Sequence, residues 1–182
     1  MAPRSTRYTP VAIALHWLAG GLILCGFALG LWLKDLPLDP PTLRLYGYHR
    51  WIGLTVLLLA LLRLAWRRFH PPPLSVAMPE WQRRAATATH ALLYALMLVI
   101  PLSGWAYSSA SGVPIVYLGL VPLPDLVPKD KSLADVLKVV HVTLNYSLLA
   151  LVAVHAGAAL KHHWVEHDDV LRRMLPFLPP RQ

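Results

Sequence analysis

The sequence has a single cysteine, Cys25, among its 182 residues. One thiol cannot form an intramolecular disulfide or a thiolate zinc site, and the chain has no Cys-x-x-Cys-His motif for covalent haem attachment. An iron–sulfur cluster bound by four cysteines is excluded for the same reason. Cys25 lies in an apolar run, where it is predicted to be a small buried or lipid-facing residue.

Charge is also scarce, because charged residues make up 14% of the chain, whereas an average soluble domain carries about 25%. Hydrophobic residues make up 56%, and the mean hydropathy is +0.48. These values argue against an ordinary cytosolic enzyme, whose surface needs more charge. They also exclude a disordered chain, which would be poor in apolar residues.

Four segments are long and apolar enough to cross a bilayer of about 30 Å, which takes about 20 helical residues. They run over residues 11–33, 46–66, 84–107 and 133–163. Thr9 and Pro10 mark the start of the first segment, as a cap residue followed by proline at the first helical position. The sequence therefore predicts an all-α integral membrane four-helix bundle, with residues 1–182 as a single membrane domain. The connection 108–132, rich in proline and glycine, is expected to contain no more than short helical turns.

The formal net charge is +8, and the distribution of the charges indicates the orientation in the membrane. The two tails and the connection between the second and third segments, with the adjoining segment ends, hold eleven basic and four acidic residues. The opposite side holds six basic and five acidic residues. Because basic residues accumulate on the cytoplasmic side, both termini are predicted to be cytoplasmic. This distribution explains the basic excess without a nucleic-acid partner.

Nine histidines are present, and five of them fall within the predicted spans at two depths. Ionisable groups inside a membrane are costly and are functional candidates by default. The outer layer contains His49 and His141, and the inner, cytoplasmic-side layer contains His16, His90 and His155. The other four lie at or beyond the cytoplasmic boundary: His70, His162, His163 and His167.

Fourteen residues separate His141 from His155, which corresponds to about 21 Å and almost four helical turns. The two imidazoles therefore point the same way from one helix, at two depths. Two stacked haems b require such a helix, together with a second imidazole at each depth from a facing helix. In the outer layer the predicted partner of His141 is His49. In the inner layer the spacing leaves both His16 and His90 as partners for His155.

Glycine and arginine residues near these histidines support haem binding. Gly20 follows His16 by four residues, and Gly53 follows His49 by four, which places each glycine one turn away on the same helix face. A flat macrocycle held by an imidazole must lie against that turn, and glycine leaves room for it. Arg63 lies fourteen residues after His49 at cytoplasmic depth, where it is expected to pair with a haem propionate.

Two other chemistries use histidines inside a membrane protein. A non-haem transition-metal site is the main alternative, since histidine also binds Zn, Cu and Ni. Against it, the two layers lie about 20 Å apart, and no intramembrane carboxylate completes a ligand set in either. A histidine proton relay is the weaker alternative, because such pathways usually include Asp or Glu.

Several short motifs occur along the chain in a fixed order. They are Leu15-His16-Trp17 in the first segment, His49-Arg50-Trp51-Ile52-Gly53-Leu54 in the second, His90-Ala91-Leu92-Leu93-Tyr94 and Pro101-Leu102-Ser103-Gly104-Trp105 in the third, and His141 and His155 in the fourth. In order and spacing they resemble the bacterial cytochrome b561 family. This family consists of four-helix integral membrane di-haem cytochromes, which are also similar to the cytochrome b subunits of nickel–iron hydrogenases.

The resemblance implies that His16 and His155 ligate a haem b on the cytoplasmic side, and that His49 and His141 ligate a second haem b on the outer side. It thus favours His16 over His90, which would lie beside the inner haem or a quinone site. A bacterial inner-membrane location and electron transfer between an outer donor and the quinone pool are implied as well. One activity of the family is oxidation of superoxide to dioxygen with reduction of ubiquinone.

Candidate residues for both substrates of that activity can be named. His162 lies seven residues after the inner-layer histidine of its segment, on nearly the same face and about 10 Å closer to the cytoplasm. It is expected to hydrogen-bond a quinone carbonyl, with Lys161 or Arg67 nearby. Superoxide is a small anion, so outer basic residues next to the outer-layer histidines are expected to steer it, namely Arg50 and Lys138.

Two other functions remain as alternatives. A haem b subunit that passes electrons from a partner dehydrogenase or hydrogenase to quinone would have no substrate of its own. The short tails of this chain favour independent action over such docking. A non-haem metal transporter or a structural membrane protein would show no haem absorbance when purified, which distinguishes it from both haem proteins.

Overall fold

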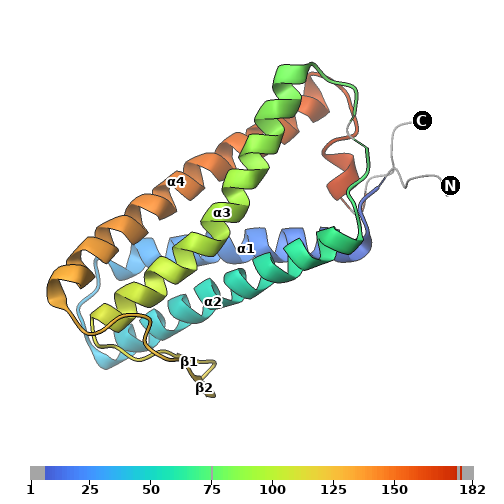
Figure 1. The fold of residues 1–182 in the computed structure, drawn as a ribbon. Helices are drawn as coiled ribbons and strands as arrows, with labels where there is room; N and C mark the ends of the chain where they lie inside the picture. Colours follow the sequence, from blue (N-terminus) through green and yellow to red (C-terminus); the bar gives the residue numbers. More distant parts are fainter. Residues whose placement is uncertain (1–6, 75, 176, 178–182) are drawn as a thin grey trace.

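The structure, a computed structural model, describes residues 7–74, 76–175 and 177 (Figure 1). Its four long helices are α1 (Pro10–Leu33), α2 (Pro40–Phe69), α3 (Glu80–Ala110) and α4 (Lys131–Trp164). Two short strands, β1 (Val116–Tyr117) and β2 (Val121–Pro122), separate α3 from α4, and a 3-10 helix, η1 (Arg172–Met174), follows α4. The predicted all-α four-helix fold is confirmed. Every helix extends beyond the predicted segment at one or both ends.

Polar caps fix where three of the helices begin. Thr9 Oγ1 accepts a hydrogen bond from the backbone N–H of Ala12 at 3.3 Å, and Pro10 is the first helical residue, as predicted. The carboxylates of Asp39 and Asp130 accept from the N–H groups three residues further along α2 and α4, at 2.8 and 3.0 Å. Each cap satisfies one of the N–H groups that a helix start leaves without a partner.

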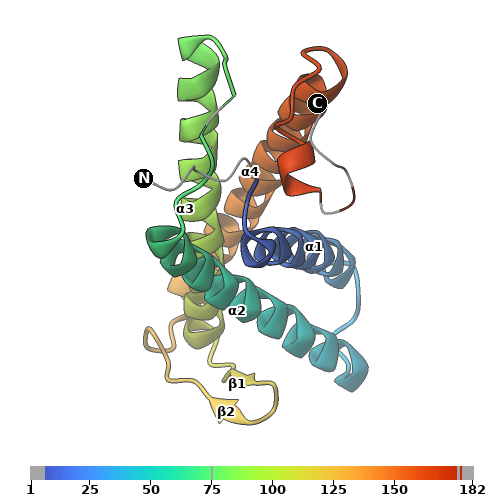
Figure 2. The ribbon, with the colours of Figure 1, turned by 90° about the vertical axis from the view of Figure 1, so that its right-hand side faces the viewer.

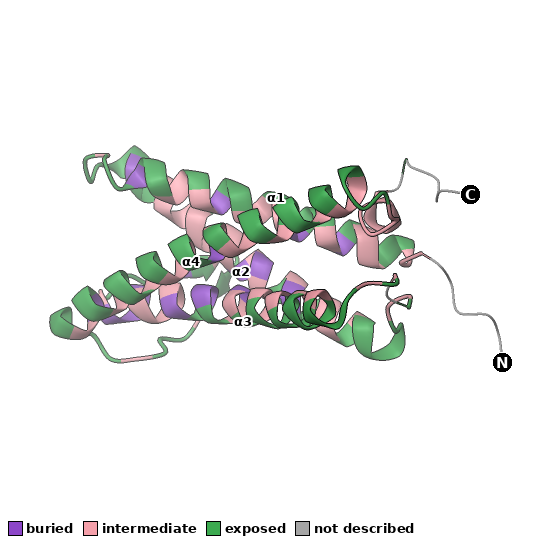
Figure 3. Ribbon diagram, turned by 90° about the horizontal axis from the view of Figure 1, so that it is seen from above, coloured by how far each residue is buried: buried purple, intermediate pink, exposed green. Residues whose placement is uncertain are grey.

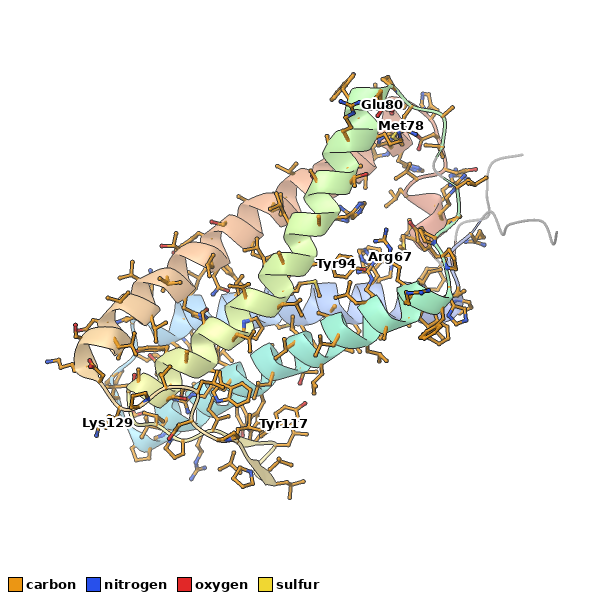
Figure 4. All side chains as sticks on the ribbon, viewed as in Figure 1. Arg67, Met78, Glu80, Tyr94, Tyr117 and Lys129 are labelled. Atoms are coloured by element: carbon orange, nitrogen blue, oxygen red, sulfur yellow. The ribbon has the colours of Figure 1, made fainter. Side chains whose placement is uncertain are left out.

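Consecutive helices run antiparallel, so the start of α1, the end of α2, the start of α3 and the end of α4 lie at the same end of the molecule (Figure 1). Two tryptophans tie this end together. Trp66 donates its indole N–H to Thr9 Oγ1 at 3.0 Å, and Trp17 donates to the carbonyl of Met174 at 2.8 Å. Figure 4 shows Glu80 at this end and Lys129 at the other. The segments that were predicted to be cytoplasmic therefore share one end.

The buried core belongs to the first three helices. Ala19 of α1, Val56 and Ala60 of α2 and Met97 of α3 form it, together with half-buried leucines and isoleucine around them. Only two described residues of α4 are buried, Ala134 and Leu148. Outward faces of all four helices are largely exposed (Figure 3), although they are apolar. Exposed apolar faces of this extent are typical of helices that are surrounded by lipid.

Among the described residues, three helices are long and apolar enough to cross a membrane: α1, α3 and α4. Their hydropathies are 2.0, 1.7 and 1.7. This finding makes the chain a membrane protein. α2 is not one of the three, and it carries two arginines within its predicted span, Arg50 and Arg63. The fourth span therefore stays a prediction.

The connection between α3 and α4 differs from the expectation of helical turns only. β1 and β2 pair antiparallel, with Val116 opposite Pro122 and Tyr117 opposite Val121. Leu118 and Gly119 turn the chain with φ of 53° and 72°. Two consecutive positive φ values are typical of the tight turns that suit the twist of a hairpin, and glycine is favoured there. The non-glycine residue at the first turn position concealed this hairpin in the sequence.

Candidate functional site

His49 of α2 and His141 of α4 face each other in the outer half of the bundle. Their ring centroids are 6.2 Å apart, and the ring planes are nearly perpendicular, at 84°. Each residue lies at the depth that the sequence predicts, so the predicted outer pair is brought together. His49 Nδ1 is buried and has no hydrogen-bond partner among the described residues.

α3 holds the ring of His141 in one orientation. The Nδ1 atom lies 3.1 Å from the carbonyl oxygen of Ile100 and 3.0 Å from Ser103 Oγ. A carbonyl can only accept, so Nδ1 carries the proton and donates it to Ile100. Its other ring nitrogen, Nε2, therefore keeps a free lone pair. Metal-ligating histidines nearly always have this hydrogen bond on the nitrogen that does not bind the metal.

Two glycines make room for the outer rings, and the sequence interpretation did not identify their role. A Cβ on Gly104 would lie 2.9 Å from His141 Cε1, and one on Gly30 would lie 3.1 Å from His49 Cε1. By contrast, a Cβ on Gly20 or Gly53 would meet nothing within 4 Å. The two residues chosen from i, i+4 spacing thus border open space, and their role beside a haem stays a prediction.

A cleft adjoins the outer pair and is lined by all four helices. The space between its walls, including the part open to the surroundings, is about 440 Å³. The lining includes both outer histidines, Gly53 one turn from His49, and Met97 and Leu148 from α3 and α4. Apart from the two imidazoles and Asn145, the lining is apolar or glycine.

Three histidines meet in the inner half of the bundle. The ring of His155 in α4 lies 6.0 Å from that of His16 in α1, at an interplanar angle of 69°. It lies 5.2 Å from the ring of His90 in α3, at 73°. The predicted inner layer is therefore assembled with both partners that the spacing left open. The ring of His90 lies closer to that of His155 than the ring of His16 does.

Arg63 reaches the inner histidines from α2. Its Nη1 lies 3.1 Å from His16 Nδ1, and its guanidinium carbon lies 5.5 Å from the ring centroid of Tyr94. A guanidinium has only donors, so Arg63 donates and His16 Nδ1 accepts in this contact. Figure 4 shows Tyr94 and Arg67 between α3 and α2, in the half of the bundle that contains the inner histidines. The predicted cytoplasmic depth of Arg63 agrees with its place here.

The two outer rings, and likewise the rings of His16 and His155, have the separation expected of two imidazoles on opposite sides of one haem iron. A metal–imidazole bond is about 2 Å long, and a ring nitrogen lies about 1 Å from its ring centroid. Two rings on opposite sides of one iron therefore have centroids about 6 Å apart. The distances of 6.2 and 6.0 Å match this value, whereas 5.2 Å for His90 and His155 is too short.

The residues predicted to contact quinone lie in two places. His162 Nδ1 is 2.6 Å from both Glu166 Oε2 and Asp168 Oδ2, and Lys161 Nζ is 2.5 Å from Glu166 Oε1. The ammonium group of Lys161 holds the pKa of the Glu166 carboxyl below its usual value. Together the imidazole and the two carboxylates offer three ligand atoms within 4.8 Å of one another. Within the described part of the chain, no hydrogen bond or ion pair joins Arg67 to Lys161 or His162.

The two basic residues predicted to steer superoxide lie on different helices at the outer end. Arg50 follows His49 directly in α2 and is half-buried, and Lys138 precedes His141 by three residues in α4 and is exposed. Neither has an ion-pair partner among the residues described here. Their positions agree with the outer side that the sequence predicts.

The chain matches the family model described as prokaryotic cytochrome b561 over residues 7–177. It is 35% identical over 173 residues to cytochrome b561 homolog 2 of Escherichia coli K12, covering 93% of this chain and 91% of the relative. It is also 32% identical to cytochrome b561 homolog 1 of the same organism, with 93% and 97% covered. The chain belongs to the prokaryotic cytochrome b561 family. Its members are membrane proteins that bind haem b and transfer electrons.

A third relative of this cytochrome b561 is named probable superoxide oxidase CybB, from Yersinia pestis. It is 28% identical over 171 residues, with 93% of this chain and 96% of the relative covered. The predicted family is thus confirmed on nearly the whole chain, together with haem b as the cofactor of the family. The number of haems, their ligands and both substrates are matters for proposal.

Proposed function

We propose that the chain is a di-haem b electron-transfer enzyme that oxidises superoxide at the outer side of the bacterial inner membrane and reduces ubiquinone. The observation that carries this proposal is the pair of ring separations, 6.2 and 6.0 Å, at two depths on α4. Both termini are cytoplasmic in this proposal, in agreement with the basic residues at their end of the bundle.

In this proposal His49 and His141 hold the outer haem, and His16 and His155 hold the inner one. The shorter separation of His90 from His155 supports His16 as the inner ligand and leaves His90 beside the haem. Each pair of histidines would hold one haem, which would supply one-electron transfer when bound. The histidines therefore fix the positions and depths of two redox centres.

Arg63 is proposed to bind a propionate of the inner haem. Its contact with His16 Nδ1 places the ring proton of a neutral His16 on Nε2. A neutral His16 that ligates iron through Nε2 must carry its proton on Nδ1 instead, so Arg63 must turn to another acceptor. A propionate is a carboxylate, which guanidinium binds with two parallel hydrogen bonds.

The proposed reaction balances in electrons and protons. Two superoxide anions each lose one electron and become dioxygen, while one ubiquinone gains two electrons and two protons. Arg50 and Lys138 raise the local concentration of the anion near the outer pair. The name of the Yersinia pestis relative supports superoxide as the donor.

The quinone is proposed to bind near the inner pair at the cytoplasmic edge, with His162 as the residue that exchanges protons with it. Support comes from its carboxylate partners, Glu166 and Asp168, through which protons can reach the imidazole. Lys161 holds Glu166 in place from the same turn of α4. Arg67 belongs to the other side of this site, next to the inner histidines in the proposed arrangement.

The decisive experiment is a reduced-minus-oxidised spectrum with haem quantitation, followed by superoxide addition to the purified protein with and without ubiquinone. We expect two low-spin haems b per chain, rapid reduction by superoxide, and reoxidation only when ubiquinone is present. Two haems that superoxide does not reduce would reject the donor and favour a subunit that serves a partner dehydrogenase. A protein without haem absorbance would reject both haem functions and favour a metal transporter.

A further inference from the structure

The hairpin between α3 and α4 exposes a set of apolar side chains. The exposed fractions are 81% for Leu120, 53% for Leu118, 52% for Val121 and 41% for Val116. The sequence has no charged residue from Ser111 to Pro124. Single exposed apolar residues are normal on a protein surface, but a contiguous group marks an interaction site.

The hairpin lies beside α2 and not beyond the end of the bundle (Figures 1 and 2). Two side chains of α2 hold it there. Trp51 donates its indole N–H to the carbonyl of Val116 at 2.8 Å, and Thr55 Oγ1 lies 2.9 Å from the hydroxyl of Tyr117. Figure 4 shows Tyr117 where the hairpin adjoins α2.

The depth of these anchors follows from the contact between α2 and α1. A Cβ on Gly26 of α1 would lie 3.0 Å from Ile52 Cγ2, so these two residues are level with each other. Gly26 is seven residues inside the outer end of α1 at Leu33, which is about 10 Å. α1 has 24 residues and is about 36 Å long, only slightly more than the hydrocarbon thickness of about 30 Å. Ile52 therefore lies within the hydrocarbon layer, and Thr55 lies deeper still.

Several polar groups of the hairpin backbone have partners, which lowers the cost of an apolar environment. The N–H of Leu123 donates to the carbonyl of Ile115 at 2.9 Å, and the N–H of Leu120 donates to the carbonyl of Tyr117 at 3.0 Å. The carbonyl of Val116 accepts from the N–H of Gly119 at 3.2 Å, in addition to the tryptophan. Backbone groups without partners would otherwise keep such a segment in water.

We propose that residues 115–123 are inserted into the outer leaflet, with Leu118, Leu120 and Val121 among the lipid acyl chains. The partner of this surface is lipid, because the hairpin is anchored at membrane depth and runs alongside a helix of the bundle. Trp51 and Tyr117 hold the base of the hairpin against α2 through their polar atoms. The inference does not depend on which electron donor the protein uses.

Site-directed spin labelling of the full-length, haem-loaded protein tests the insertion. The exposed Cys25 is replaced in a Cys25→Ser background, and a nitroxide is attached to Leu120→Cys or, as the matched control, to Asp125→Cys in the same connection. Both side chains are exposed, so neither substitution disturbs packing. After reconstitution into phosphatidylcholine vesicles, power saturation measures collisions with oxygen, which dissolves in lipid, and with a water-soluble nickel chelate.

We expect the Leu120 label to collide several-fold more with oxygen and several-fold less with the nickel chelate than the Asp125 label does. Equal nickel accessibility at the two positions would place the tip in water and overturn the proposal. A Leu120 label that neither reagent reaches would also overturn it, since a protein surface would then cover the tip. Haem absorbance of both labelled proteins serves as the check that they are folded.

Discussion

Each outer imidazole lies against a glycine of a neighbouring helix, which leaves its ring little freedom. His141 contacts Gly104 of α3, and His49 contacts Gly30 of α1. The histidines could be predicted from the sequence because fourteen-residue spacing is a property of one helix. The role of these glycines could not, because such contacts depend on how two helices are aligned, and spacing within one helix contains no information on that alignment.

Gly104→Ala is expected to displace the His141 ring and to weaken or abolish binding of the outer haem. The added Cβ would lie 2.9 Å from Cε1 and 3.2 Å from Nδ1, so the hydrogen bond to Ile100 is strained as well. Overpacking of this kind costs about 1–3 kcal/mol. Haem quantitation and the low-spin absorbance report the loss. Gly21→Ala, which meets nothing within 4 Å, is the control, and equal haem content in both variants would contradict the prediction.

Alanine substitution separates the two inner-layer partners of His155. His16→Ala is expected to retain about one haem per chain, because it removes an axial ligand at one depth only. His90→Ala is expected to retain two, with at most an altered potential at the inner haem. A pyridine haemochrome assay on the purified variants gives the numbers. The reverse outcome would assign the ligand to His90 and reject the argument from ring separation.

α4 was predicted well as an element, since its hydropathy and its two histidines are visible in the sequence. The hairpin was not predicted, because each strand has two residues and the turn begins with leucine at positive φ. The turn after α4 was also missed. It depends on Asp168, whose backbone N–H donates to the carbonyl of His162 while its carboxylate contacts the same residue.

His162→Ala is expected to slow ubiquinone reduction roughly 100-fold, the lower range of a general acid–base contribution. Superoxide-dependent haem reduction should keep its rate, because the outer pair is unchanged. Stopped-flow measurement of haem reduction and reoxidation distinguishes the two steps. His70→Ala is the matched control at the same end, since His70 is exposed and stacks on Trp66 at 3.9 Å. An unchanged reoxidation rate in His162→Ala would exclude the residue from the quinone site.

At the scale of the whole molecule, basic residues divide unequally between the two ends. The outer end is nearly balanced in charge, so any attraction of an anion there depends on where individual cations lie and not on their total. Arg50 of α2 directly follows His49, and Lys138 of α4 precedes His141 by three residues.

The double variant Arg50→Gln, Lys138→Gln is expected to lower the rate of superoxide oxidation roughly tenfold at low ionic strength, since focused fields raise encounter rates by 10-fold or more. The difference from the unmodified protein should shrink as salt screens the charges. Arg68→Gln removes a cation from the opposite end and serves as the control. Pulse radiolysis at several salt concentrations provides the rates, and a salt-independent rate in the unmodified protein would refute steering.

Each proposed ligand pair includes one imidazole from α4, whereas the buried core is made by α1, α2 and α3. The chain is synthesised from its N-terminus, so the core can form in the membrane before the last helix has left the ribosome. In the proposed assignment, the outer pair is complete only after translation has passed His141, and the inner pair only after it has passed His155. Loading of both haems would then be a late step in biogenesis, and a chain truncated before α4 would keep only half of each proposed ligand pair.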